Sequence, residues 1–127
     1  MRLLLDTHTF LWWITDHPRL SSRARKAIEE TAEIFVSAVT AWEVVTKHRL
    51  GKLPDAEGRV DRLAEIALEE GMQLLPISFA QGLRAGAYSA THRDPFDRML
   101  AAQAELNDLV LVTRDPLFKG FPVHTLW

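Results

Sequence analysis

Four carboxylates stand beside the apolar runs of this 127-residue chain, and they are Asp6, Glu43, Asp97 and Asp115. Asp6 and Asp115 follow runs that favour strands, whereas Glu43 and Asp97 lie near the start of predicted helices. In a parallel sheet, strand ends and the starts of the crossover helices share one edge. We therefore expect the four carboxylates to converge on one rim, although they are far apart in the sequence.

Convergent carboxylates repel one another, and they cannot all stay ionised at contact distance without a cation. The chain contains no cysteine, so hard oxygen ligands favour Mg²⁺, or Mn²⁺ as its substitute, over zinc. A cation held in this way suits hydrolysis of phosphodiester bonds, because it activates water and neutralises charge on the phosphate. The acids thus predict a metal-dependent nuclease centre.

The elements that must position these acids alternate along the chain. Short apolar runs predict strands at residues 2–5, 34–36, 74–77, 109–112 and 123–126. Amphipathic stretches predict helices that begin at Thr7 or Thr9, at Ser21 or Ser22, at Thr40, near Val60, at Ser78 and at Asp94. This alternation predicts an α/β fold in one domain of residues 1–127, with a mostly parallel sheet of four to five strands covered on both faces.

Two of the acids near helix starts have strong structural alternatives. Thr40 and Glu43 have the spacing of a capping box, in which the glutamate satisfies a backbone N–H group. Glu43 alone is therefore about as consistent with a cap as with a metal ligand. Asp94 is better explained as the N-cap before Pro95 than as a ligand.

The other acids have weaker alternatives. Asp6 could cap the helix that follows it, although Thr7 and Thr9 can serve instead. Asp97 could merely favour the helix dipole, and Asp115 could be a turn residue. No single acid is decisive, and the prediction depends on their shared rim.

Several neighbours could support the site. His8 is expected to hold Asp6 by a hydrogen bond. Arg93, Arg98 and Arg114 flank the predicted site, and arginine is suited to binding phosphate. Each of these arginines could equally be a solvated surface charge.

Composition sets broad limits. The formal net charge is −2, which alone argues against a nucleic acid partner, but the rest of the chain is net positive if the four acids bind cations. The absence of cysteine excludes disulfides and thiol nucleophiles. The first residues do not have the pattern of a signal peptide, and no stretch is long and apolar enough for a membrane span. We expect a cytoplasmic protein without a membrane partner.

Five segments resemble the PIN-domain family. They are Leu3–His8 (LLLDTH), Leu11–Trp13 (LWW), Ser37–Glu43 (SAVTAWE), His92–Ala104 (HRDPFDRMLAAQA) and Val112–Asp115 (VTRD). The block from His92 to Ala104 is the most specific of them, and it is similar to the corresponding block of VapC-type toxins. The resemblance covers essentially the whole chain, in the order and spacing of the family.

The resemblance implies a three-layer α/β/α sandwich with a PIN-like sheet. It places the family's acids on Asp6, Glu43, Asp97 and Asp115, and its usual metal positions on Asp6 and Asp97. Thr113 matches the small hydroxyl residue that commonly precedes the last acid. Asp94 is an additional acid, whose role the resemblance leaves open.

The resemblance also implies a function and partners. It predicts a Mg²⁺-dependent endoribonuclease that acts as the toxin of a type II toxin–antitoxin module. RNA would be its substrate, a cognate antitoxin would silence it, and a second copy would complete a homodimer. The sequence does not identify the RNA, the antitoxin or the number of metal ions.

Besides the nuclease, the residues are compatible with two other classes of function. A phosphoacceptor domain, receiver-like or phosphatase-like, also uses Mg²⁺ and an aspartate after the first strand. A receiver needs a phosphorylatable aspartate after a middle strand, where this chain has Ile77 and Ser78, and a haloacid-dehalogenase phosphatase needs an aspartate at position 8, which is His8. A non-catalytic PIN-like binding module is the third alternative, and the complete set of acids argues against it.

Overall fold

Five parallel strands form one sheet in the computed structural model, which describes residues 1–127. They are β1 (Arg2–Leu5), β2 (Glu33–Ser37), β3 (Gln73–Leu75), β4 (Val110–Val112) and β5 (Thr125–Leu126). Their order is β3-β2-β1-β4-β5, and every neighbouring pair is parallel. β1 is central because Leu3, Leu4 and Leu5, which are fully buried, leave no face for water. The predicted sheet is therefore confirmed, with all five strands parallel.

Six α-helices connect and cover the strands. They are α1 (Thr7–Ile14), α2 (Ser22–Glu30), α3 (Ala38–Arg49), α4 (Leu63–Glu69), α5 (Phe79–Ala87) and α6 (Pro95–Leu106). Three short 3₁₀ helices are also present, η1 (Pro54–Ala56), η2 (Val60–Arg62) and η3 (Pro116–Gly120), and the sequence predicts neither η1 nor η3. The helix expected from Val60 thus begins as the 3₁₀ turn η2 and becomes α-helical at Leu63.

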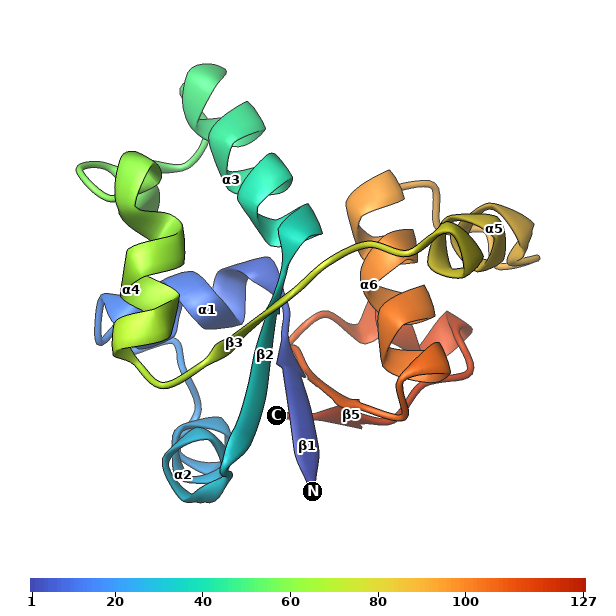
Figure 1. Cartoon of the computed structure of the whole chain (residues 1–127), viewed down its shortest axis with the longest axis horizontal. Helices are drawn as coiled ribbons and strands as arrows, with labels where there is room; N and C mark the ends of the chain where they lie inside the picture. Colours follow the sequence, from blue (N-terminus) through green and yellow to red (C-terminus); the bar gives the residue numbers. More distant parts are fainter.

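The helices form two layers, one on each face of the sheet (Figure 1). Leu3 and Leu5 of β1 share a core with residues of α1, α2 and α4. Leu4, which points the other way because strand side chains alternate, shares a second core with residues of α5 and α6. The three-layer α/β/α architecture is confirmed. None of the helices is long and apolar enough to cross a membrane.

Three of the six predicted helix starts are confirmed, and two are wrong. Ser21, Ser78 and Asp94 cap α2, α5 and α6. Helix α1 is capped by Asp6, whose side chain accepts from the Thr9 N–H group, and neither Thr7 nor Thr9 is the cap. Helix α3 begins at Ala38 and is capped by Ser37, so Thr40 lies within the helix.

The topology explains why the acids meet. Asp6 follows the central strand β1, and Asp115 comes three residues after the end of its neighbour β4. Helix α3 leaves the end of β2 on the other side of β1. Helix α6 contacts α3, which brings its first turn to the same edge of the sheet.

Candidate metal centre

A polar cavity of about 300 Å³ opens at the carboxyl edge of the sheet, beyond β1 and β4. All four predicted acids line it, together with Asp94 and four other polar residues: Thr7, His8, Lys47 and His92. A larger hollow of about 400 Å³ beside β3 and α4 contains no titratable side chain. The cavity at the sheet edge is therefore the place where chemistry is concentrated.

Asp6 is held rigidly at the bottom of this cavity. Its Oδ1 accepts a hydrogen bond from the Thr9 N–H group at 2.8 Å, and its Oδ2 accepts one from the Thr113 hydroxyl at 2.5 Å. Burial raises the pKa of Asp6 above its usual value, although both threonines oppose the shift. Asp6 therefore acts both as a helix cap and as a buried carboxylate of the site, with Thr113 as its direct support.

Glu43 is not a helix cap. It is the sixth residue of α3, not a member of its first turn, and it is almost fully buried. Its Oε1 accepts from the Thr7 hydroxyl at 2.5 Å, and its Oε2 pairs with the Lys47 ammonium group. The capping-box interpretation fails because Ser37 starts the helix three residues before Thr40.

Asp97 lies in the first turn of α6, and it contacts a residue that the sequence interpretation did not single out. Its Oδ2 lies 2.8 Å from Nε2 of His92. Burial raises the pKa of Asp97 to about 6; the hydrogen bond with His92 opposes the shift, and the charges of Asp94 and Glu43 add to it. The positive charge that the protein places near Asp97 is therefore too small to keep its pKa at the ordinary value.

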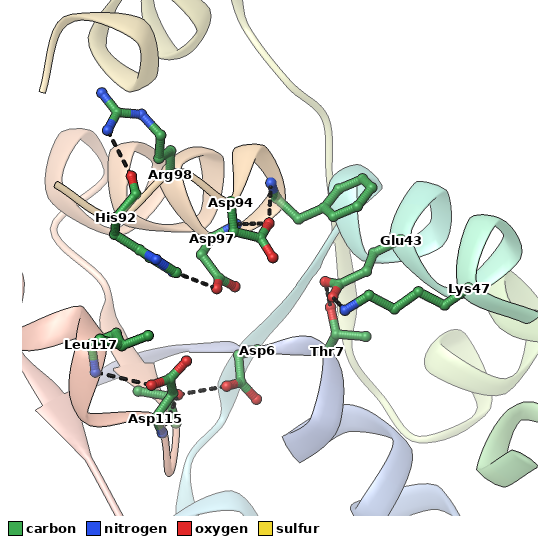
Figure 2. A network of polar contacts seen from close by, with 12 residues as sticks. Asp6, Thr7, Glu43, Lys47, His92, Asp94, Asp97, Arg98, Asp115 and Leu117 are labelled. Atoms are coloured by element: carbon green, nitrogen blue, oxygen red, sulfur yellow. Dashed lines mark hydrogen bonds and ion pairs between the residues drawn. The ribbon is translucent and has the colours of Figure 1, made fainter. Parts of the chain in front are cut away.

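The two remaining acids, Asp94 and Asp115, both cap helices and line the cavity. Asp94 caps α6, as predicted, by accepting from the N–H groups of Phe96 and Asp97 at 2.8 and 3.3 Å. Asp115 caps η3 by accepting from the Leu117 N–H group at 2.9 Å, and its own N–H group donates to the Thr113 hydroxyl. Figure 2 shows Asp97 and Asp115 on either side of the space above Asp6. Asp94 and Asp115 each cap a helix through Oδ1 alone. The Oδ2 atom of each of these two carboxylates is therefore free of protein hydrogen bonds.

The cavity holds more negative charge than the protein neutralises. Five carboxylates line it, and Lys47 is its only lysine or arginine. Partial burial lowers the pKa of Lys47, but the hydrogen bond and charge of Glu43 outweigh burial, so the net shift is upward. Donor atoms of His92, Asp97 and Asp115 lie within 4.8 Å of one another. A divalent cation fits this donor set, because it would supply the missing charge and take oxygen ligands.

Arg98 does not contact this cavity, contrary to its predicted place beside the phosphate. Its guanidinium group donates to five backbone carbonyls, those of Ala85, Gly86, Tyr88, Ala90 and His92. The distances range from 2.7 to 3.3 Å. Arg98 therefore fixes the loop between α5 and α6, and its donors are occupied.

The predicted hydrogen bond between His8 and Asp6 is not formed. His8 is exposed, and its ring lies 5.5 Å from that of Trp12. With Asp6, Trp12 and Asp115 it lines a neighbouring hollow that also contains Arg114. Arg114 is exposed there, so it stays available to an anionic ligand.

Sequence reasoning missed three residues of the site: Thr7, Lys47 and His92. Lys47 lies four residues after Glu43, which is a helical ion-pair spacing and was a usable signal. Thr7 was considered only as a cap, although it directly follows Asp6. His92 opens the block that resembles VapC-type toxins, but the sequence does not show that this loop residue meets Asp97, five positions later, because their contact depends on the fold.

Comparisons with known proteins identify the family of this chain. Residues 3–122 match the PIN domain family. The chain is similar to Ribonuclease VapC22 of Mycobacterium tuberculosis, with 31% identity over 114 residues that cover 89% of this chain and 86% of the relative.

Solved structures share the fold across nearly the whole chain. VapBC2 from Rickettsia felis, bound to a promoter DNA fragment, matches with a TM-score of 0.71 and 17% identity, covering 99% of this chain and 98% of the other. DNA-bound VapBC from Salmonella typhimurium matches with a TM-score of 0.71 and 19% identity, covering 99% and 97%. From the family match, the curated relative and the shared architecture, we conclude that this chain belongs to the PIN domain family, as a member of its VapC group.

Proposed function

We propose that this protein is a metal-dependent endoribonuclease and the toxin of a type II toxin–antitoxin module. The observation that carries the proposal is the convergence of Asp6, Glu43, Asp94, Asp97 and Asp115 on one cavity with a single lysine. The similar protein from Mycobacterium tuberculosis is named a ribonuclease. Membership in the PIN domain family argues against the phosphoacceptor alternatives.

Mg²⁺ is the proposed cofactor, with Mn²⁺ as its substitute. Asp6 and Asp97 would hold the cation, and Asp115 would complete the centre. When bound, the cation lowers the pKa of a water molecule and offsets charge on the scissile phosphate. An acidic cavity accepts an anionic RNA strand only with that cation present, so strict metal dependence follows from the charge of the cavity.

The protein's own residues supply rigidity. Thr9 and Thr113 fix the two oxygens of Asp6, while Thr7 and Lys47 fix those of Glu43. Preorganised carboxylates need no rearrangement during the reaction, which is a major source of catalytic power. Arg114, exposed beside Asp6 and Asp115, is placed to contact a neighbouring phosphate of the RNA.

A cognate antitoxin is the proposed protein partner. This is supported by the structural neighbours, which include VapBC proteins from Rickettsia felis and Salmonella typhimurium and a toxin–antitoxin complex from Klebsiella pneumoniae. A short reading frame for a small DNA-binding protein directly upstream of the gene would support this role. A homodimer is also proposed, and the apolar side chains Phe79 and Leu83, which are 86% and 64% exposed on α5, offer surface for it.

An RNA cleavage assay tests the activity. The wild type should cut RNA with Mg²⁺ and lose activity when the ion is chelated, and Asp6→Asn and Asp97→Asn should be inactive with Mg²⁺. Asparagine caps helices as well as aspartate does, so Asp6→Asn should still fold. Asp61→Asn, an exposed acid away from the cavity, is the matched control and should remain active. Metal-independent cleavage that survives both site substitutions would exclude the proposal.

A further inference from the structure

His92 is the one half-buried histidine that faces the acidic cavity. Its side chain is 16% exposed, and its Nε2 lies 2.8 Å from Oδ2 of Asp97. Donor atoms of His92, Asp97 and Asp115 all lie within 4.8 Å of one another. Figure 2 shows the imidazole ring pointing from the loop before α6 toward the carboxylates.

The protein fixes this ring from two sides. The His92 carbonyl accepts a hydrogen bond from Nη1 of Arg98 at 2.9 Å, which holds the backbone. The ring lies edge-on to Phe118 and Phe121, with centroid distances of 6.5 and 6.0 Å. Two aromatic neighbours leave the imidazole few alternative rotamers, so its direction is determined by packing and not by Asp97 alone.

The observed spacing suits coordination of one ion. Two ligands on neighbouring corners of an octahedral site lie about 3 Å apart, because each is about 2.1 Å from the ion. The 2.8 Å between His92 Nε2 and Asp97 Oδ2 is close to that separation. By contrast, His8 is exposed and has no hydrogen bond to any acid of the cavity.

We infer that His92 is a nitrogen ligand of the metal centre, beside Asp97 and Asp115, and that it raises the affinity of the centre for Mn²⁺ relative to Mg²⁺. A neutral imidazole would bind through the lone pair of Nε2 and carry its proton on Nδ1. Mg²⁺ strongly favours oxygen ligands, whereas first-row transition ions accept imidazole readily. The inference rests on the proposed function only in requiring that a divalent ion binds in this cavity.

Calorimetric titration of the full chain with MnCl₂ and with MgCl₂ tests the preference. His92→Gln should weaken Mn²⁺ binding by about 10-fold or more, the usual effect of losing a metal-site partner, and should change Mg²⁺ binding by less than about 3-fold. His124→Gln, at an exposed histidine outside this cavity, is the matched control and should bind both ions as the wild type does. Thermal melting without metal should show that both variants fold.

Pulsed electron paramagnetic resonance of the Mn²⁺ complex provides a direct readout. A ¹⁴N coupling should be present in the wild type and in His124→Gln, and absent from His92→Gln. An unchanged Mn²⁺ to Mg²⁺ affinity ratio in His92→Gln, or no ¹⁴N coupling in the wild type, would overturn the inference while leaving a nuclease with oxygen ligands intact. If the wild type binds neither ion, both the inference and the proposed metal dependence fail.

Discussion

Glu105 and the carboxylates of the cavity have opposite electrostatic environments. Glu105 on α6 accepts two hydrogen bonds from Arg84, at 2.6 and 3.1 Å, and one from the Tyr88 hydroxyl at 2.8 Å. These partners lower the pKa of Glu105, with Arg84 as the main cause. In the cavity at the sheet edge, burial instead raises the pKa values of Asp6 and Asp97.

The difference shows which group stabilises the fold and which is kept for a ligand. Arg84 and Glu105 form a bidentate pair that is complete within the chain. The cavity gathers five acids and one lysine, an arrangement that costs folding energy until a cation binds. We therefore expect a functional site where the protein leaves charge unbalanced. Where the charges are balanced within the chain, we expect a contribution to stability.

The largest expected effect is on activity in the cavity. Asp97→Asn should lower the rate of Mg²⁺-dependent RNA cleavage by at least about 1000-fold, because the variant would lose the charge of a proposed metal ligand, which is worth several kcal/mol to the transition state. Glu105→Gln should leave the rate within about 2-fold of the wild type. Single-turnover cleavage measurements check both. Equal losses in the two variants would remove the distinction between the groups.

A smaller effect is expected from the arginine that supports the cavity. Arg98→Lys keeps the charge but cannot reach all five carbonyls. It should lower the free energy of unfolding by about 3 kcal/mol, since several half-buried carbonyls lose their donor. Chemical denaturation measures this, with exposed Arg62→Lys as the control, which should change stability by less than about 0.5 kcal/mol. A phosphate-binding role for Arg98 would instead reduce RNA affinity without loss of stability.

The contrast between Arg98 and Asp6 shows how far the sequence alone could lead. The strand pattern places Asp6 at the carboxyl end of the first strand, and the parallel topology of the sheet brings the other acids to the same edge. Arg98 is an arginine next to Asp97, as expected of a residue that binds phosphate. The direction of its side chain, however, depends on the loop that packs over it. Sequence patterns predict which edge a residue reaches, whereas the partner of a long side chain is decided by tertiary contacts.

Glu43 illustrates a second limit. Its spacing from Thr40 predicts a capping box, but Ser37 is an equally good cap and lies directly at the end of β2. Helix boundaries are uncertain by a few residues in any sequence-based prediction. Here a shift of three residues turned a first-turn glutamate into a buried member of the cavity.

Removal of one acid should stabilise the metal-free protein. Asp97→Asn removes a half-buried carboxylate whose ionised form is disfavoured by burial and by the charges of Asp94 and Glu43, so it should raise the free energy of unfolding at pH 7.5 by about 1–2 kcal/mol in the presence of a chelator. Saturating Mg²⁺ should stabilise the wild type by about 2.7 kcal/mol at 100 times the dissociation constant, and the variant much less. Denaturation curves with chelator and with Mg²⁺ measure both effects. A destabilised metal-free variant would show that the repulsion is already relieved within the chain.

The smallest expected effect is on stability, from Glu105. Its sign is opposite to that of Asp97→Asn, because removing this carboxylate should destabilise the fold. Since the pKa of Glu105 is lower in the folded than in the unfolded state, its ionised form stabilises the fold above its ordinary pKa, and this contribution is lost as the pH falls through the folded value. Glu105→Gln should therefore lower the Tm by about 3 °C at pH 7, and the gap to the wild type should narrow as the pH falls below the ordinary pKa of glutamate. Glu69→Gln, which removes an exposed partner of Arg62, is the matched control and should shift the Tm by less than about 1 °C. A Tm difference that stays constant with pH would mean that Glu105 contributes through packing and neutral hydrogen bonds. The ion pair with Arg84 would then not be what distinguishes Glu105 from the acids of the cavity.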